Sequence, residues 1–489
     1  MVDFCSFCDK IFLMKSKLKF FFITFLVMSI FTSCATFDSI KSVFKEAFGS
    51  DGKESVSSNQ NKVSIKSSNV IQSNLKVLTN YEIPEDYSKA YSFRTGKPHA
   101  LAKKIPAETA KLRTTNPSEY VKKCCEFIKL NSTDDFERIK IAHDIIALNI
   151  KYDAASFWSG NLPRQDYETV LKTGFAVCEG YSNTFKKFMD VLGFKNQIVH
   201  GYARGVGTSL LTENGATNHA WNLVRIENEY YLIDSTWDSG YMEGKKSVQN
   251  YNTDWLFVKP EHFIYTHYPD NKNEQLLKSP FSKEEFLLLA EFRPNFFDVA
   301  ESSVLPKKQN ECKSSFEFDY SLKSGGNFSF TVADYSSNKN IQNATYTFNQ
   351  ENGKKTVIQF PKAGNYKINV FYFAKNAKSG VSCGEFYVKA TEKSSILYPQ
   401  LYTNSFSANL ISPIEMPLEC GKTYHFELSC PEKKFVAIIC GNNFTQMNKN
   451  ESGNFELDFT IPSGITKVNV GASSSERGSY QTIATYTCK

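Results

Sequence analysis

The sequence predicts an α+β domain followed by two all-β sandwich domains. Before residue 295, apolar residues recur with helical spacing in several places, and runs typical of strands lie between them. After Pro294, apolar residues instead alternate with polar ones, and Gly, Asn and Pro separate the runs. A chain of 489 residues also suits about three domains. We place these domains at residues 81–295, 296–392 and 393–489.

Three helices are predicted in the first domain. Residues 119–130 and 134–150 carry apolar side chains every three or four positions, and Thr133 or Asp134 is suited to cap the second helix. Residues 178–192 form the third helix, whose apolar face ends before Gly193, a residue type favoured just beyond a helix.

Three strands follow in the same domain. They are expected at residues 196–202, 219–226 and 230–237. A tight turn at Glu227-Asn228 joins the last two into a hairpin.

The two C-terminal domains are predicted from short alternating strands. The clearest runs are Phe316-Phe318-Tyr320, Phe328-Phe330-Val332, Tyr366-Ile368-Val370-Tyr372, Phe455-Leu457-Phe459-Ile461 and Val468-Val470. Such strands over two stretches of about 95 residues are typical of small β-sandwiches. Gly364-Asn365-Tyr366, before one of them, is similar to the Tyr-bearing strand of immunoglobulin-like domains.

The N-terminus has the pattern of an export signal. Lys15, Lys17 and Lys19 precede an apolar run over residues 20–31, which is shorter than the roughly 20 apolar residues that span a bilayer. A basic segment, a short apolar segment and small residues before a cleavage site are typical of secretory signals. The alternative is an uncleaved N-terminal anchor or a buried helix.

The residues around Cys34 extend this prediction. They are similar to a bacterial lipobox, although Phe31 stands where Leu is usual. We predict a signal peptide over residues 1–33 with Met14 as the true start, and lipidation of Cys34. Residues 34–80 turn polar and rich in Ser, Asn and Lys, which favours a flexible tether. Together these features predict an exported protein that is lipid-anchored to a membrane of the bacterial cell envelope.

Charge and cysteine usage narrow the function classes. The net charge is +6 and the lysines are spread along the chain, which does not favour a nucleic-acid partner. No CxxC pair with metal spacing occurs after Cys34, which does not favour a zinc site. We also predict no other metal and no cofactor. Cys124 and Cys125 fall in a helical pattern and are expected to be buried thiols. Four cysteines near the C-terminus could form disulfides in an exported protein: Cys420, Cys430, Cys440 and Cys488.

Cys178 is the candidate nucleophile. It lies in the first turn of a predicted helix, where the helix dipole stabilises a thiolate. A cysteine nucleophile also needs a base, usually His. In the predicted hairpin, Asp234 lies opposite Trp221, so His219 and Asp234 project to the same face with their Cβ atoms about 7 Å apart. A register shifted by one residue would put them on opposite faces.

The three residues matter as a set. A lone Cys, His or Asp in such positions is usually structural, but their order and the hairpin geometry together indicate a Cys–His–Asp site. The Cys178 backbone N–H is the default oxyanion donor, and the second donor is left open. Asp153 and Trp237 are expected to shape the cleft. The remaining histidines that we considered lack spaced partners and are expected to be packing or surface residues: His143, His200, His262, His267 and His425.

The motifs around these residues resemble the transglutaminase-like superfamily, in particular its kyphoscoliosis-peptidase type branch. The signature blocks are Val177-Cys178-Glu179-Gly180-Tyr181, His219-Ala220-Trp221-Asn222 and Asp234-Ser235-Thr236-Trp237. Supporting blocks are Asn149-Ile150-Lys151-Tyr152-Asp153, Gly201-Tyr202-Ala203 and residues 260–267. The resemblance covers residues 90–295 and implies a papain/transglutaminase-like core with Cys178 as nucleophile, His219 as base and Asp234 as its orienting carboxylate. No acidic loop is typical of a calcium site, so calcium activation is not implied.

The sequence therefore predicts a membrane-tethered cysteine enzyme acting on amide bonds of proteins or peptides through a thioester. Water would make it a peptidase or deamidase and an amine would make it a transglutaminase; we favour hydrolysis because water is abundant in the envelope. The alternative is a non-catalytic surface adhesion or scaffold protein that uses the same domains for protein binding. Its oligomeric state is left open.

Overall fold

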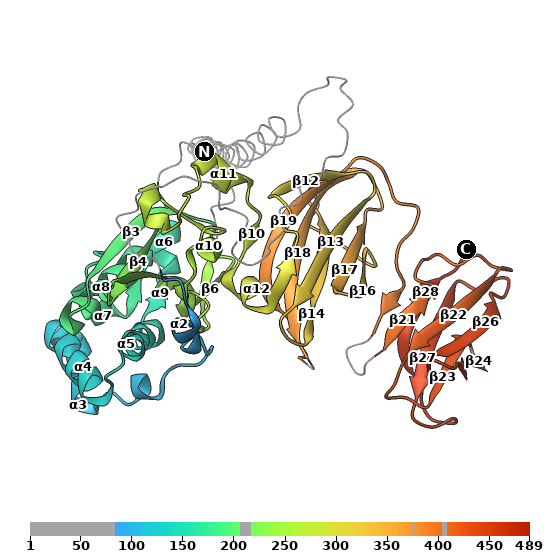
Figure 1. Ribbon diagram of the computed structural model, residues 1–489, viewed down its shortest axis with the longest axis horizontal. Coiled ribbons are helices and arrows are strands. Elements are labelled where there is room, and N and C mark those ends of the chain that lie inside the picture. The colour runs from blue at the N-terminus through green and yellow to red at the C-terminus, as the bar shows by residue number, and fades with distance from the viewer. Residues whose placement is uncertain (1–83, 206–216, 376, 403–407) are drawn as a thin grey trace, which may run out of the picture. The chain divides into compact units, whose positions relative to one another are not determined.

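The computed structural model describes residues 84–489, apart from residues 206–216, 376 and 403–407 (Figure 1). The predicted signal peptide, the lipidation residue Cys34 and the predicted tether lie outside the described residues. Within the described ranges, no helix is both long enough and apolar enough to cross a membrane.

The first domain combines helices with an antiparallel sheet (Figure 1). Its helices are α2 (Ser88–Ser92), η1 (Ala100–Lys103), α3 (Ala107–Thr115), α4 (Pro117–Asn131), α5 (Asp135–Asn149), α6 (Ala154–Ser159), α7 (Tyr167–Thr173), α8 (Cys178–Leu192), α9 (Ser235–Ser239), α10 (Pro260–Phe263), η2 (Lys272–Gln275) and α11 (Lys283–Leu288). The predictions for α4, α5 and α8 are confirmed, and Asp134 caps α5 by accepting a 3.0 Å hydrogen bond from the N–H of Glu137.

The central sheet has the strand order β8-β5-β4-β3-β9, and all neighbours are antiparallel. Its strands are β3 (Asn196–Ala203), β4 (His219–Ile226), β5 (Glu229–Ile233), β8 (Leu256–Val258) and β9 (His267–Pro269). Two short ladders are β1 (Lys151–Tyr152) with β2 (Phe175–Ala176), and β6 (Gly240–Glu243) with β7 (Lys246–Gln249).

One strand prediction is wrong at its end. Strand β5 stops at Ile233 instead of continuing to Trp237. The Asp234 side chain accepts hydrogen bonds from the backbone N–H groups of Thr236 and Trp237, and this capping starts helix α9.

Both faces of the central sheet are buried, because successive side chains of β4 enter different apolar clusters. Val224 and Ile226 belong to the larger cluster, which also contains the buried faces of α4, α5 and α8. Trp221 and Leu223 belong to a second cluster with Trp255. The strand that carries His219 is therefore fixed from both sides.

Two β-sandwiches follow, each built from two sheets (Figure 1). The sheets of the first are β10-β19-β18-β14-β15, with β12 pairing β19, and β11-β13-β17-β16. Its elements are β10 (Glu291–Phe292), α12 (Pro294–Val299), β11 (Ala300–Ser303), β12 (Gln309–Cys312), β13 (Ser315–Leu322), β14 (Gly326–Asp334), β15 (Asn340–Ile341), β16 (Thr345–Gln350), β17 (Gly353–Gln359), β18 (Gly364–Ala374) and β19 (Val381–Ala390). Because β10 pairs with β19, this sheet begins before residue 295, where we expected the first domain to end.

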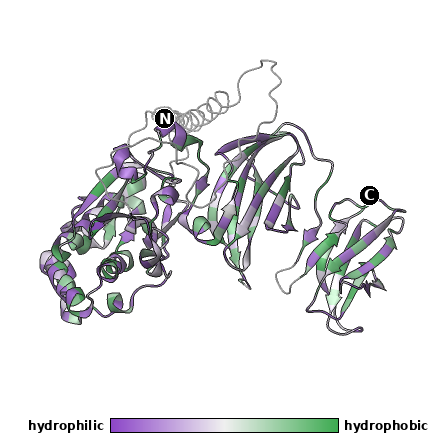
Figure 2. Ribbon diagram, viewed as in Figure 1, coloured by the Kyte–Doolittle hydropathy of each residue, from purple (hydrophilic) through white to green (hydrophobic). Residues whose placement is uncertain are grey.

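The second sandwich has the sheets β20-β28-β27-β23-β24 and β21-β22-β26-β25. Its strands are β20 (Gln400–Leu401), β21 (Asn409–Ser412), β22 (Thr423–Ser429), β23 (Phe435–Cys440), β24 (Asn443–Gln446), β25 (Asn448–Lys449), β26 (Phe455–Thr460), β27 (Lys467–Ser473) and β28 (Gln481–Thr487). Figure 2 shows hydrophilic and hydrophobic residues alternating along the strands of both sandwiches. The mixed α+β class with two C-terminal sandwiches is therefore confirmed.

Two details refine the predictions for the first sandwich. Helix α12 begins at Pro294, so helical structure continues beyond the point where we expected it to end. The Tyr366 hydroxyl donates a 2.8 Å hydrogen bond to the Lys362 carbonyl, the contact by which a tyrosine corner closes onto its own chain.

The cysteines agree with the predictions in part. Cys124 and Cys125 are buried as predicted, whereas the C-terminal cysteines are free thiols rather than disulfides.

Candidate active site

Cys178 is the first residue of α8, immediately after the extended Val177. The Val177 N–H donates a 3.0 Å hydrogen bond to Gln165 Oε1, which fixes the entry into the helix. Gly180 lets this turn pack closely, because a Cβ there would lie 2.8 Å from the Ala176 Cβ atom. The Cys178 N–H is one of the donors that a helix start leaves without an intrahelical partner. The side chain is half-buried, so a substrate can reach it.

The hairpin has the predicted register. Asn222 pairs with Ile233 and Ile226 with Glu229, so the next pair outward places Asp234 opposite Trp221. His219 and Asp234 consequently meet on one face, with 2.8 Å between His219 Nε2 and Asp234 Oδ2.

His219 also contacts the candidate nucleophile. Its imidazole also interacts with the Cys178 side chain, and since Nε2 faces Asp234, the ring nitrogen left for the thiol is Nδ1. Burial alone would favour the neutral ring. The negative charge of Asp234 and the interaction with Cys178 outweigh burial and raise the pKa of His219 to about 10. The arrangement therefore favours a protonated His219 ring beside the ionised Asp234 carboxylate.

Asp234 has two separate tasks. Its Oδ1 accepts from the N–H groups of Thr236 and Trp237 at 2.9 and 3.3 Å, while its Oδ2 faces His219. Burial disfavours the carboxylate, but the charge and hydrogen bond of His219 hold the pKa of Asp234 well below its usual range. The side chain is 1% exposed and ionised.

A second histidine on Asp234 was missed by the sequence analysis. His267 Nε2 lies 3.3 Å from Asp234 Oδ2, and its Nδ1 lies 2.9 Å from the Thr266 hydroxyl. Burial lowers the pKa of His267 to about 4, so the ring is neutral and donates to Asp234 from Nε2. Its position directly after Tyr265-Thr266, in a block that we linked to the family, was the one available signal.

The other histidines that we considered agree with the prediction of packing or surface residues, except for His143. His262 stacks on Phe297 with 4.4 Å between ring centroids, and His425 is an exposed partner of Asp458, as expected for packing and surface residues. His200 is also exposed but pairs with Glu179 at 2.9 Å, beside the nucleophile. The prediction is wrong for His143, which is fully buried between two carboxylates.

The two predicted cleft residues have different roles. Trp237 lies next to the His219 imidazole, with 5.4 Å between the ring centroids of Trp237 and His219. Asp153 caps helix α6 by accepting a 3.0 Å hydrogen bond from the N–H of Ser156. Trp237 is therefore placed to contact a substrate, whereas Asp153 is explained by local structure.

Among the described residues, the side chains of His219, Asp234 and His267 could jointly hold a metal ion, because one ligand atom of each lies within 4.8 Å of the others. The same atoms already form the hydrogen bonds described above. The absence of a metal requirement stays a prediction.

Metal removal tests that prediction. Treatment with EDTA should leave the rate at which iodoacetamide alkylates Cys178 unchanged, because the ring nitrogens and the carboxylate satisfy one another. The rate is followed by mass spectrometry of the Cys178 peptide. A loss of reactivity that added Zn²⁺ restores would show that a metal holds the three side chains.

Comparison with known families agrees with this geometry. Residues 122–235 match the family model of the transglutaminase-like superfamily, a segment that includes Cys178, His219 and Asp234. The chain carries a transglutaminase-like domain.

Individual relatives match the same part of the chain. Kyphoscoliosis peptidase from Homo sapiens is 32% identical over 176 residues, which are 35% of this chain and 27% of that protein. Cytokinesis protein 3 from Schizosaccharomyces pombe is 29% identical over 113 residues, covering 22% of this chain and 13% of that protein. A solved structure described as a TGase is 22% identical and covers 34% of this chain and 40% of that chain, with a TM-score of 0.20. The chain thus spans about a quarter or less of the length of these curated relatives.

Proposed function

We propose that the protein is a cysteine-nucleophile enzyme that acts on amide bonds of proteins or peptides through a thioester intermediate. The observation that carries the proposal is the position of His219, whose Nε2 lies 2.8 Å from Asp234 Oδ2 and whose ring also interacts with the Cys178 side chain. A binding module has no need for a half-buried cysteine at a helix start beside a histidine that a buried carboxylate orients.

The chemistry follows from the charges. The Cys178 thiolate attacks the amide carbonyl carbon, and the Cys178 N–H faces the oxyanion that forms. The His219 imidazolium then gives its proton to the departing nitrogen, which breaks the C–N bond and leaves a thioester. Neutral His219 takes a proton from the incoming water or amine, which displaces Cys178 and restores the ion pair.

The acceptor decides the name of the reaction. Water gives a carboxylic acid, as in a peptidase or deamidase, and a lysine amine gives a new amide, as in a transglutaminase. We propose hydrolysis, on the ground that water is abundant where the protein is expected to reside. Gln-containing peptides test this: ammonia release without an amine marks hydrolysis, and incorporation of a labelled amine marks transamidation.

Thiol reactivity tests the enzyme proposal itself. At pH 6, iodoacetamide should alkylate Cys178 at least about tenfold faster than N-acetylcysteine, since an ordinary thiol has a pKa near 8.5 and is almost fully protonated. Cys420, which is also half-buried, serves as a control within the same molecule. His219→Ala should reduce the rate at Cys178 to that of the simple thiol. Equal rates for Cys178 and N-acetylcysteine, unchanged by His219→Ala, would leave a non-catalytic binding role.

The His219 ion pair also predicts a pH dependence of stability. Because the pKa of His219 is raised to about 10, the folded protein binds this proton more tightly than the unfolded chain. Its stabilising contribution is complete below about pH 6.5, the ordinary value for His, and is lost as the pH rises through the folded-state pKa.

The measurement compares wild type with His219→Gln in urea at several pH values. All four tryptophans, at positions 158, 221, 237 and 255, lie in the first domain, so their fluorescence reports its unfolding. The difference in unfolding free energy between the two proteins should shrink from pH 6 to pH 10. A difference that stays constant over this range would contradict the raised pKa.

We further propose that the enzyme is exported and held at a membrane of the cell envelope through lipidated Cys34. The basic and apolar segments before Cys34 support this proposal. A Cys34→Ala variant should move from the membrane fraction to the soluble fraction after cell lysis. Full retention in the membrane fraction would contradict lipidation at this position.

A further inference from the structure

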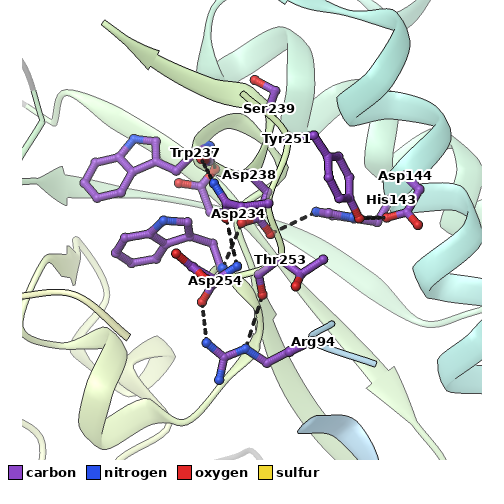
Figure 3. A network of polar contacts seen from close by, with 12 residues as sticks. Arg94, His143, Asp144, Asp234, Trp237, Asp238, Ser239, Tyr251, Thr253 and Asp254 are labelled. Carbon is purple, nitrogen blue, oxygen red and sulfur yellow. Dashed lines mark hydrogen bonds and ion pairs between the residues drawn. The ribbon is translucent and has the colours of Figure 1, made fainter. Parts of the chain in front are cut away.

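A buried network of charged side chains lies close to Asp234 of the candidate active site (Figure 3). His143 and Asp144 from α5 and Asp238 from α9 are each 0% exposed. His143 Nδ1 lies 2.9 Å from Asp144 Oδ1, and His143 Nε2 lies 3.1 Å from Asp238 Oδ2. The neighbours of Asp144 are charged or polar as well: Lys140 Nζ, the Tyr251 hydroxyl and the backbone N–H of His99.

Hydrogen-bond chemistry requires one extra proton in this network. Two ionised carboxylates only accept, so each ring nitrogen of His143 must donate, which requires an imidazolium. If His143 is instead neutral, Asp238 must carry the proton and donate it to Nε2, because His143, Lys140 and the backbone N–H of His99 lower the pKa of Asp144 despite its burial. In both cases His143 and Asp238 share one proton. The directions of their pKa shifts agree: burial outweighs its hydrogen bonds in raising the pKa of Asp238 to about 6, and the two carboxylates outweigh burial in raising the pKa of His143.

Helix α9 connects this network to the active site. Asp234 precedes its first residue and Asp238 lies one turn later, with the Asp238 N–H donating to the Asp234 carbonyl at 3.3 Å. Both residues are bound to Trp255: the Asp234 N–H donates to its carbonyl at 3.0 Å, and Asp238 Oδ1 accepts from its N–H at 2.9 Å. Figure 3 shows Asp234 close to Asp238, with His143 facing Asp238.

A helix this short does not hold its own position. Helix α9 has five residues, Ser235–Ser239, far fewer than an isolated helix needs to be stable in water. Its placement therefore depends on its attachments, and the hydrogen bond between Asp238 and His143 ties it to α5. Asp234 Oδ1 is occupied by the cap of α9, so a shift of α9 moves the Oδ2 atom that faces His219.

We propose that Asp238 is a positioning residue of the Cys178 site: through its hydrogen bond to His143, it fixes α9 against α5 and so holds the Asp234 carboxylate toward His219. This inference rests on the proposed function. Asp238 contacts neither the thiol nor the imidazole of the site, and it acts on them through the placement of Asp234.

Three substitutions of Asp238 distinguish the effect of the position of α9 from the effect of the negative charge at residue 238. Asn is the isosteric replacement: its oxygen accepts from Trp255 N–H and its amide donates to neutral His143 Nε2, so the link to α5 survives without the shared proton. Glu keeps the charge and the proton but adds a methylene, which displaces α9. Ala leaves both the Trp255 N–H and His143 without their partner.

The readout is the ratio of Cys178 alkylation rates at pH 6 and pH 9.5, with folding checked by tryptophan fluorescence and circular dichroism. Asp238→Asn should keep the wild-type ratio within about twofold, whereas Asp238→Glu and Asp238→Ala should lower the ratio at least about tenfold, toward that of an ordinary thiol. General loosening of the domain would instead raise alkylation at both pH values. If Asp238→Ala does not fold, the comparison of Asp238→Glu with Asp238→Asn still tests the positioning role.

The outcomes also separate this inference from the proposed function. If wild-type Cys178 reacts no faster than N-acetylcysteine at pH 6, the proposed function fails before any variant is compared. If wild type is fast and Asp238→Glu keeps its ratio, the enzyme proposal stands and Asp238 has no positioning role. If Asn lowers the ratio while Glu keeps it, the buried charge is required rather than the placement of α9, and the inference is overturned.

Discussion

Asp234→Asn is expected to slow the alkylation of Cys178 at pH 6 by at least about a hundredfold, since loss of the equivalent charge costs about ten-thousandfold in a serine-protease triad. Asn keeps the cap of α9, because its oxygen still accepts from the N–H groups of Thr236 and Trp237. Its amide, however, presents a donor where His219 Nε2 needs an acceptor. The imidazole must then carry its proton on Nδ1, beside the thiol, and can no longer accept the thiol proton.

The control for this change is Asp166→Asn. Asp166 caps α7 in the same way, by accepting a 3.1 Å hydrogen bond from the N–H of Thr169, but it has no part in the site. It should leave the alkylation rate at Cys178 unchanged. A wild-type rate in Asp234→Asn would remove the carboxylate from the mechanism.

His267→Phe is expected to give the second large effect, a fall of about ten- to hundredfold in the same rate. The reason is the loss of one donor to the buried Asp234 carboxylate, since a hydrogen bond to a charged group is worth about 1.5–3 kcal/mol. The Phe ring suits the space, because His267 stacks on Phe263 with 4.1 Å between centroids and also contacts Trp237 and Trp255. The variant therefore removes the donor and keeps the packing.

Two comparisons make this result specific. His267→Gln places an amide N–H near the position of Nε2 and should restore most of the rate. His262→Phe changes another histidine that stacks on an aromatic ring but has no contact with Asp234, and it should react like wild type. If His267→Phe also reacts like wild type, the 3.3 Å contact is without consequence for the thiol.

The local sequence was sufficient to predict much of the candidate site. A helix start at Cys178 and a hairpin turn at Glu227-Asn228 are encoded by neighbouring residues, and the turn alone sets which side chains share a face. The meeting of His219 with Asp234 followed from that register. The two sandwiches could be predicted equally well, because the alternation of apolar and polar residues can be recognised in each strand separately.

Contacts between distant segments were not accessible in the same way. His267 reaches Asp234 because β9 pairs with β3, and His143 reaches Asp238 because α5 packs beside α9; neither pairing has a signature in the local pattern. The early end of β5 was missed for another reason. The capping side chain of Asp234 competes with strand hydrogen bonds, and we had assigned this residue to the site alone.

The turn of the β4–β5 hairpin is also a suitable site for inserting a label or tag. Glu227 and Asn228 are exposed and lie at the closed end of the β4–β5 ladder, whereas His219 and Asp234 lie at its open end. A single residue added within either strand would move one partner to the opposite face, but residues added between Glu227 and Asn228 lengthen the turn and leave every pair unchanged. A fluorophore site or affinity tag placed there would report on the domain without disturbing its chemistry.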